Sequence, residues 1–222
     1  MTPSTLPSTP AATPTAAPRF YFAAGTCALA SHIALEAAGA DYQAVKLDFR
    51  ANEQNAPDFL AINPKGRVPA LLTARGVITE TPALLLYIAQ MHPQAGLAPL
   101  DDPFALAELQ AVTSYLCATV HVAHAHRPRA YRWADDEAAQ RCMQAKVTQN
   151  MGDCFAYIEG QLLRGPWVMG ETFTIADPYL FTLGTWLAGD GVDIARFPRV
   201  AEHSQRVRAL PAVQRVLPLH GL

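Results

Sequence analysis

The sequence predicts a small α/β domain followed by an all-helical domain. Short apolar runs alternate with amphipathic stretches over residues 19–93, a segment rich in proline and glycine spans residues 94–102, and only helical spacing follows over residues 103–222. Half of the 222 residues are hydrophobic and only 16% are charged, so the chain is able to bury cores of this size. Residues 1–18 consist largely of Thr, Ser, Pro and Ala, without a cationic start or a continuous apolar stretch. They are predicted to form a disordered tail and not a signal peptide or a membrane anchor.

The α/β part is expected to follow the order β-α-β-α-β-β-α. Apolar runs and strict alternation indicate strands, threefold to fourfold spacing indicates helices, and Thr73-Ala-Arg-Gly76 indicates a hairpin turn. The expected elements are a strand at 20–22, an amphipathic helix at 27–38, a strand at 45–49, a helical turn around 59, strands at 68–72 and 77–78, and a helix at 81–89.

The rest of the chain is expected to be helical. The expected helices are 104–124, from 135 or 136 to 165, one that starts at 174, and shorter ones at 200–210 and 212–217. Thr174 and Asp177 have the spacing of a capping box, with Phe173 just before the cap. Pro178 would then be the fourth helical residue, where its missing N–H removes an early helical hydrogen bond.

Composition restricts the classes of partner. The chain has 17 basic and 19 acidic residues, a net charge of −2 and no basic run, so we expect neither nucleic acid nor an anionic membrane as a partner. No segment is apolar over the length that a bilayer requires. The cysteines at 27, 117, 142 and 154 show no C-x-x-C pattern and no zinc-ligand spacing, which predicts reduced thiols in the cytoplasm and no metal site.

Cys27 stands where an apolar strand gives way to a helix. The positive end of a helix dipole and free backbone N–H groups favour a thiolate over a thiol at such a position. Free cysteine is also among the most buried residue types and often fills space as a small hydrophobe. Position alone leaves both interpretations open.

Two further segments predict a site for a thiol peptide. Pro69 lies near the start of a strand, where an X-Pro bond can be cis and the strand edge can pair with a bound peptide, although such a turn is usually structural. At the start of the next helix, Thr81 can help to hold a carboxylate and Glu80 can accept from an ammonium group. A cap and a solvated charge are the ordinary roles of these two residues. Together with Cys27, however, the order and spacing describe a receptor for a thiol tripeptide.

These residues carry a resemblance to the glutathione transferases, and most closely to their cysteine-containing bacterial beta class. The similar segments are 25–35, 63–71, 79–84 and 167–181, and the resemblance covers residues 19–222. It implies a thioredoxin-like domain that binds glutathione at 19–93, a linker at 94–102, and a helical domain at 103–222 that lines a hydrophobic co-substrate pocket. It also implies a cytoplasmic homodimer with a role in detoxification.

The resemblance also implies roles for individual residues. Cys27 would face the glutathione sulfur and could form a mixed disulfide with it. Val68 would pair its backbone with the cysteinyl unit before a cis Pro69, and Glu80 with Thr81 would hold the γ-glutamyl end.

His121 matches the histidine that reaches the sulfur from the first long helix, where it would hydrogen-bond the thiolate or assist proton transfer. Without the resemblance, His121, His124 and His126 are expected to be partly exposed polar residues. A metal is not expected there, because only the first two share a helical face.

Some positions depart from the class. Asn52, or alternatively Arg50, occupies the loop place where a lysine usually contacts glutathione. Ser114, with Ala118 and Thr119, replaces larger polar residues that usually support the sulfur site. These changes are expected to affect affinity and rate more than fold.

Three functions follow from the sequence. The leading one is a glutathione transferase that conjugates reduced glutathione to small hydrophobic electrophiles, with no metal cofactor. The second is a monothiol, glutathione-dependent thiol–disulfide oxidoreductase that uses Cys27 itself. The third is a non-catalytic protein that binds glutathione or other ligands in the cleft between the domains.

Overall fold

A computed structural model describes residues 17–222, so the predicted tail at 1–18 lies almost entirely outside the described residues. The order of elements in the first part confirms the predicted β-α-β-α-β-β-α sequence. The elements are β1 (Arg19–Phe22), α1 (Ala28–Ala37), β2 (Gln43–Lys46), a 3-10 turn (Glu53–Asn55), α2 (Pro57–Ile62), β3 (Ala70–Thr73), β4 (Gly76–Thr79), α3 (Thr81–Met91) and a second 3-10 turn (Pro93–Ala95).

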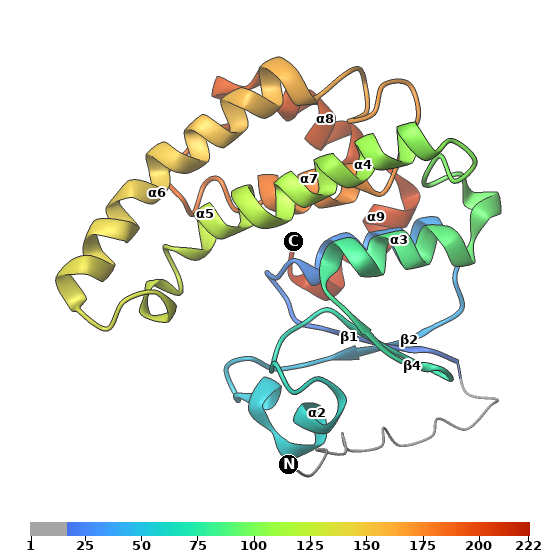
Figure 1. The fold of residues 1–222 in the computed structure, drawn as a ribbon, viewed down its shortest axis with the longest axis horizontal. Helices are drawn as coiled ribbons and strands as arrows, with labels where there is room; N and C mark the ends of the chain where they lie inside the picture. The colour runs from blue at the N-terminus through green and yellow to red at the C-terminus, as the bar shows by residue number, and fades with distance from the viewer. Residues whose placement is uncertain (1–16) are drawn as a thin grey trace, which may run out of the picture.

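The four strands form one mixed sheet in the order β2-β1-β3-β4. β1 runs parallel to β2 and antiparallel to β3, with Tyr21 opposite both Val45 and Ala70, and β3 pairs antiparallel with β4. Helices α1 and α3 lie on the side of the sheet that faces the helical domain, and α2 lies on the other side (Figure 1). Both faces of the sheet are therefore covered, as expected for the first α/β unit.

The predicted position of the second strand was wrong by about two residues. The alternation over 45–49 suggested a strand there, whereas β2 spans Gln43–Lys46. Its partner β1 ends at Phe22, opposite Lys46, and only Leu47 continues the pairing, through its N–H to the Phe22 carbonyl at 2.8 Å. Because the sheet offers no partner beyond that point, the strand ends and residues 49–52 form a turn.

The second part is helical, as predicted. Its elements are α4 (Pro103–Tyr115), a π-helical segment (Leu116–Val120), α5 (His121–Ala125), a 3-10 turn (Ala130–Arg132), α6 (Glu137–Tyr157), a second π-helical segment (Ile158–Leu162), α7 (Ala176–Gly184), a 3-10 turn (Ile194–Arg196), α8 (Pro198–Arg208) and α9 (Pro211–His220). The predicted helix at 104–124 is thus one continuous helical path with a π-helical segment inside it. The next helix ends at Leu162 and not at Gly165. No helix among residues 17–222 has the length and apolarity needed to cross a bilayer.

Helix α1 lies at the centre of the molecule. It was expected to be amphipathic, yet every side chain from Ala28 to Leu35 is buried, because the sheet covers one side of the helix while α7 and α9 pack against the other. His32 on α1 and His220 on α9 meet at 3.0 Å between ring nitrogens. The C-terminal helix is therefore part of the support for the first domain (Figure 1).

The predicted pairing of Thr174 with Asp177 is present. The fully buried Asp177 carboxylate accepts from the Thr174 N–H at 2.6 Å and from the Val168 N–H at 2.8 Å, and it contacts His203 Nε2 at 2.9 Å. Helix α7 begins at Ala176, two residues later than predicted. Pro178 therefore lies in the first turn, where an N–H would have no partner within the helix, which explains why proline is tolerated there.

Candidate active site

A cavity of about 380 Å³ lies where the first domain meets the helical domain. Cys27, Val68 and Thr81 line it from the first domain, and His121 and Tyr179 line it from α5 and α7. Pockets of this size are typical of small-molecule sites between domains. Cys27, Val68, Pro69, Glu80, Thr81 and His121, which the sequence singled out, all line this one cavity.

Cys27 is the residue that precedes α1, and its side chain is partly exposed to the cavity. Its thiol donates a long hydrogen bond to the Val68 carbonyl, with 3.6 Å between Sγ and O. Burial raises the pKa of this thiol above its usual value, although the Thr81 hydroxyl and the Arg129 charge act in the opposite direction. The thiol form of Cys27 is therefore favoured, contrary to the expectation of a thiolate at this helix start, because desolvation outweighs the effects of its neighbours.

The loop at residues 63–69 forms the part of the cavity wall next to Cys27. The Asn63 side chain donates to the Arg67 carbonyl at 2.6 Å and ties the loop together. Gly66 has a φ of +59°, and a Cβ there would come within 2.9 Å of Asn55 Oδ1, so only glycine fits without strain. The Val68–Pro69 peptide bond is cis. Val68 lies outside β3, and its N–H donates to no backbone carbonyl among residues 17–222, so this edge is open to a peptide partner.

Glu80 and Thr81 stand at the entry to α3. Glu80 has a φ of +71°, which is uncommon for a residue other than glycine, and strained backbone of this kind concentrates at functional sites. Its carboxylate forms an ion pair with the Lys65 ammonium, which also donates to the Thr79 hydroxyl at 2.8 Å. Thr81 is almost fully buried as the first residue of the helix. The Glu80 carboxylate thus pairs with Lys65 in this structure, and its predicted contact with the ammonium group of a ligand stays a prediction.

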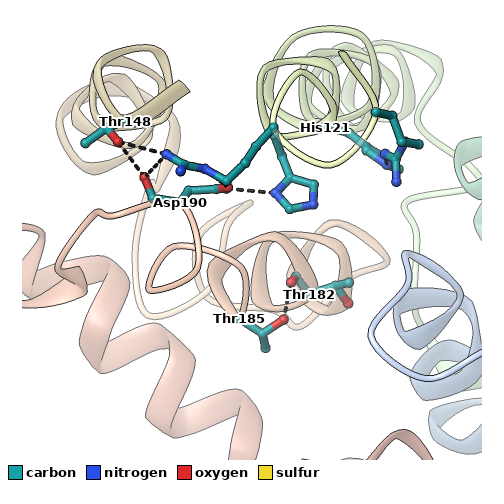
Figure 2. A network of polar contacts seen from close by, with 8 residues as sticks. His121, Thr148, Thr182, Thr185 and Asp190 are labelled. Atoms are coloured by element: carbon teal, nitrogen blue, oxygen red, sulfur yellow. Dashed lines mark hydrogen bonds and ion pairs between the residues drawn. The ribbon is translucent and has the colours of Figure 1, made fainter. Parts of the chain in front are cut away.

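His121 reaches the cavity from the start of α5 (Figure 2). Its Nε2 lies 3.4 Å from the Arg129 guanidinium, and its ring packs against Trp186 at 5.0 Å between centroids. Burial, with the nearby positive charge of Arg129, lowers the pKa of His121 to about 4. The imidazole is consequently neutral at physiological pH and accepts a hydrogen bond from Arg129.

Sequence reasoning missed five functional side chains of the cavity. Arg67, Arg129 and Arg132 surround it with positive charge, while Cys117 and Tyr179 lie on the wall formed by the helical domain. The Cys117 position depends on the π-helical segment, and such segments are frequent at functional sites. The other residues lie on loops or on a fully buried face, and no local sequence pattern indicates that their side chains point into the cavity.

Three residues of the sequence-based set do not line the cavity. Arg50 faces a separate surface pocket formed by residues near β2. Asn52 adopts a left-handed conformation with a φ of 60°, and its side-chain oxygen accepts from the Gln54 and Asn55 amides, which organises the loop. Ser114 is exposed on α4. The structure does not bring these three to Cys27, whereas Gln54, from the same loop as Asn52, lines the cavity.

A mixed four-stranded sheet with a cysteine at a helix start and a neighbouring cis-proline, joined to a helical domain, defines a two-domain protein with a thioredoxin-like thiol site. Residues 19–90 match the N-terminal domain of the glutathione S-transferases, and residues 129–206 match their C-terminal domain. The chain belongs to the glutathione S-transferase family.

Relatives support this assignment over nearly the whole chain. Glutathione S-transferase GstA of Escherichia coli O157:H7 is 30% identical over 92% of this chain and 99% of its own length. A glutathione transferase homologue from Sulfitobacter, solved with bound glutathione, is 45% identical with a TM-score of 0.89, over 93% of this chain and 99% of that one. The beta-class glutathione S-transferase of Sphingomonas chungbukensis is 32% identical with a TM-score of 0.80, over 92% and 99% of the two chains.

Proposed function

We propose that the protein conjugates reduced glutathione to small hydrophobic electrophiles, as a transferase of the beta class. The observation that carries this proposal is the meeting of Cys27, the open backbone edge at Val68 and the Glu80–Thr81 helix start in one cavity. Each matches a different part of a thiol tripeptide: the sulfur, the peptide backbone and the γ-glutamyl end. The Sulfitobacter homologue with bound glutathione and the Sphingomonas beta-class enzyme support the ligand and the class, respectively.

The charge of the cavity suits an anionic ligand. Arg67, Arg129 and Arg132 line it, against a single acidic lining residue, Glu80, among the described residues. Glutathione carries two carboxylates and one ammonium group, and it gains a further negative charge when its thiol ionises. A surplus of positive charge therefore favours both binding and the thiolate form of the bound ligand.

The raised pKa of Cys27 supports different roles for the two sulfur atoms. At neutral pH Cys27 remains a thiol, which can donate a hydrogen bond but is a poor nucleophile. In the proposed reaction the glutathione sulfur is the nucleophile, stabilised by the Cys27 S–H donor and by the Arg129 charge. The neutral His121 ring serves as a further hydrogen-bonding partner beside the sulfur. The glutathione sulfur forms a bond to carbon, the leaving group departs with its electron pair, and the thiol proton passes to solvent.

The proposed reaction uses two small substrates, glutathione and an electrophile, and requires no metal. Among residues 17–222 no group of three or more His, Cys, Asp or Glu side chains is arranged to hold a metal ion. A homodimer in the cytoplasm, as implied by the resemblance, is part of the same proposal. Light scattering on the purified full chain tests the oligomeric state, and a monomer at micromolar concentration would contradict that part.

A steady-state assay with 1-chloro-2,4-dinitrobenzene and related electrophiles tests conjugation. The expected result is saturable turnover with glutathione that is lost when glutathione is replaced by its S-methyl derivative. Turnover that stays at the uncatalysed rate across a broad panel, with glutathione still bound, would instead support the non-catalytic binding protein.

A second candidate is thiol–disulfide exchange at Cys27, and the partly exposed thiol on the cavity wall is the observation that favours it. Replacement Cys27→Ser separates the two reactions, since serine keeps an O–H donor and loses the sulfur. Conjugation is expected to fall by less than about tenfold, because one hydrogen bond to a charged group contributes roughly 1.5–3 kcal/mol and serine retains most of it. Reduction of a glutathione mixed disulfide is expected to vanish. Loss of conjugation to the background rate would contradict this division of roles between the two sulfur atoms.

A further inference from the structure

His124 lines the cavity, and its ring contacts the carboxylate of Asp190. It lies one helical turn after His121 on α5 and lines the same cavity. Its Nδ1 lies 2.8 Å from Oδ2 of Asp190, a residue of the turn that follows α7. Because an ionised carboxylate only accepts hydrogen bonds, this contact places the proton on Nδ1. An imidazole held in this way by a carboxylate is the arrangement that general acid–base catalysis uses.

Asp190 is held firmly behind the histidine. Its side chain is 1% exposed, and Arg127 places its Nε 3.4 Å from the second carboxylate oxygen. The Asp190 carbonyl accepts from Arg127 Nη2 at 3.0 Å and from the Thr148 hydroxyl at 2.8 Å, so the backbone is fixed as well (Figure 2). A buried carboxylate held in this way fixes the orientation of the imidazole.

Trp186 fixes the plane of the His124 ring. The two rings stack with 4.2 Å between centroids and 23° between planes, and both residues line the cavity. The His124 side chain is 17% exposed, and its Nε2 makes no hydrogen bond to any residue that the structure describes. Nε2 is thus the free nitrogen of an imidazole whose Nδ1 is bound by the Asp190 carboxylate and whose ring stacks on Trp186.

We infer that His124 is a catalytic acid–base residue, positioned by Asp190, for electrophiles whose adduct with glutathione must take up a proton to complete the reaction. The chemical class is that of α,β-unsaturated carbonyl compounds. This inference rests on the proposed conjugation of glutathione and adds to it a catalytic residue, His124, and a positioning residue, Asp190.

The proton balance of the step closes within the site. The glutathione sulfur forms a bond to the β-carbon, the carbon–carbon π bond breaks, and its electron pair moves to the carbonyl oxygen. Protonated His124 gives its Nε2 proton to that oxygen, and the enol product then rearranges to the ketone. The imidazole regains a proton from the next glutathione thiol as that thiol ionises. Aromatic substitution of a chloride needs no such transfer, because the chloride leaves with its electron pair.

A comparison of rates with the two types of electrophile therefore distinguishes a catalytic role of His124 from a structural one. We compare wild type with His124→Gln, using trans-4-phenyl-3-buten-2-one and 1-chloro-2,4-dinitrobenzene as probes. Loss of a general acid typically costs 10²–10⁴-fold, so kcat/KM for the enone is expected to fall about 100-fold. With the chlorinated probe it is expected to change by less than about threefold. His126→Gln is the matched control, since His126 packs against Trp133 and neither residue lines the cavity; this variant is expected to leave both rates unchanged.

A second variant covers the case in which His124→Gln fails to fold. Asp190→Asn keeps an oxygen that can accept from Nδ1 but removes the charge that supports the protonated ring. It is expected to lower the enone rate about tenfold, with the chlorinated probe again nearly unaffected. An equal fall with both probes in the folded variants, or no fall with the enone, would overturn the inference. Wild type that converts the chlorinated probe but not the enone would also overturn it while the proposed function stands. Wild type that converts neither would remove both.

Discussion

Acid is expected to destabilise the contact between α1 and α9. His32 and His220 are 1% and 3% exposed, and their ring nitrogens meet at 3.0 Å. Burial lowers the pKa of His32 to about 4 and that of His220 to about 3, from an ordinary value of 6.5. Both rings are therefore neutral in the folded protein at pH 7 and resist protonation well below that pH.

The size of the effect follows from these values. In the unfolded chain each histidine takes up a proton as the pH falls through 6.5, whereas the folded protein gains one only near pH 4 or below. The unfolded state therefore binds more protons in this window, and stability is lost as the pH falls. Between pH 7 and pH 5 each histidine removes about 1.8 kcal/mol from the free energy of unfolding, or about 3–4 kcal/mol for the pair if the two act independently.

Urea denaturation at pH 7 and pH 5 measures this difference directly. Replacement His220→Gln removes one of the two groups and is expected to shrink the difference by about 1.8 kcal/mol. His92→Gln, at the end of α3, serves as a control that should leave it unchanged. If His220→Gln shows the full wild-type difference, the buried pair is not the source of the acid sensitivity and the reasoning fails.

Three further changes have defined outcomes. Asp177→Asn removes the charge that meets His203 and is expected to cost about 3 kcal/mol of stability in urea denaturation; a change below about 0.5 kcal/mol would contradict its role in the fold. Gly66→Ala forces alanine into the left-handed region and pushes a Cβ toward Asn55. KM for glutathione is therefore expected to rise severalfold while kcat changes little. An unchanged KM would refute the claim that only glycine fits at this position. Arg129→Met removes positive charge beside Cys27. The acid limb of the pH–rate profile for conjugation is therefore expected to move to higher pH by about one unit. An unmoved limb would show that Arg129 does not stabilise the glutathione thiolate.

Much of the fold could be predicted because the local signals are strong. Apolar periodicity gave the order of the elements, and the cap at Thr174 and Asp177 marked the start of α7 to within two residues. The predictions from sequence were wrong where contacts between distant parts of the chain decide the structure. The position of β2 depends on where β1 ends, and α1 is buried on all sides because α7 and α9 cover the face that was expected to be exposed.

The candidate site was predictable from the first domain and much less so from the second. Cys27, Pro69 and Thr81 each stand at a strand end or a helix start, positions that local patterns reveal. Arg129 reaches the cavity from a loop and Tyr179 from a fully buried helix, so only the packing of the domains shows their place. The pKa of Cys27 depends on the same packing, which supplies the desolvation that the helix start alone does not indicate.

The central claim is that the cavity beside Cys27 binds glutathione by its sulfur, its backbone and its γ-glutamyl end. A crystal structure of the full chain with reduced glutathione tests it most directly. We predict the ligand sulfur within about 4 Å of Cys27 Sγ, the cysteinyl backbone paired with Val68, and the γ-glutamyl carboxylate at the N-terminus of α3 beside Thr81. Glutathione bound at another site, or an empty cavity at a saturating concentration of the ligand, would contradict the account.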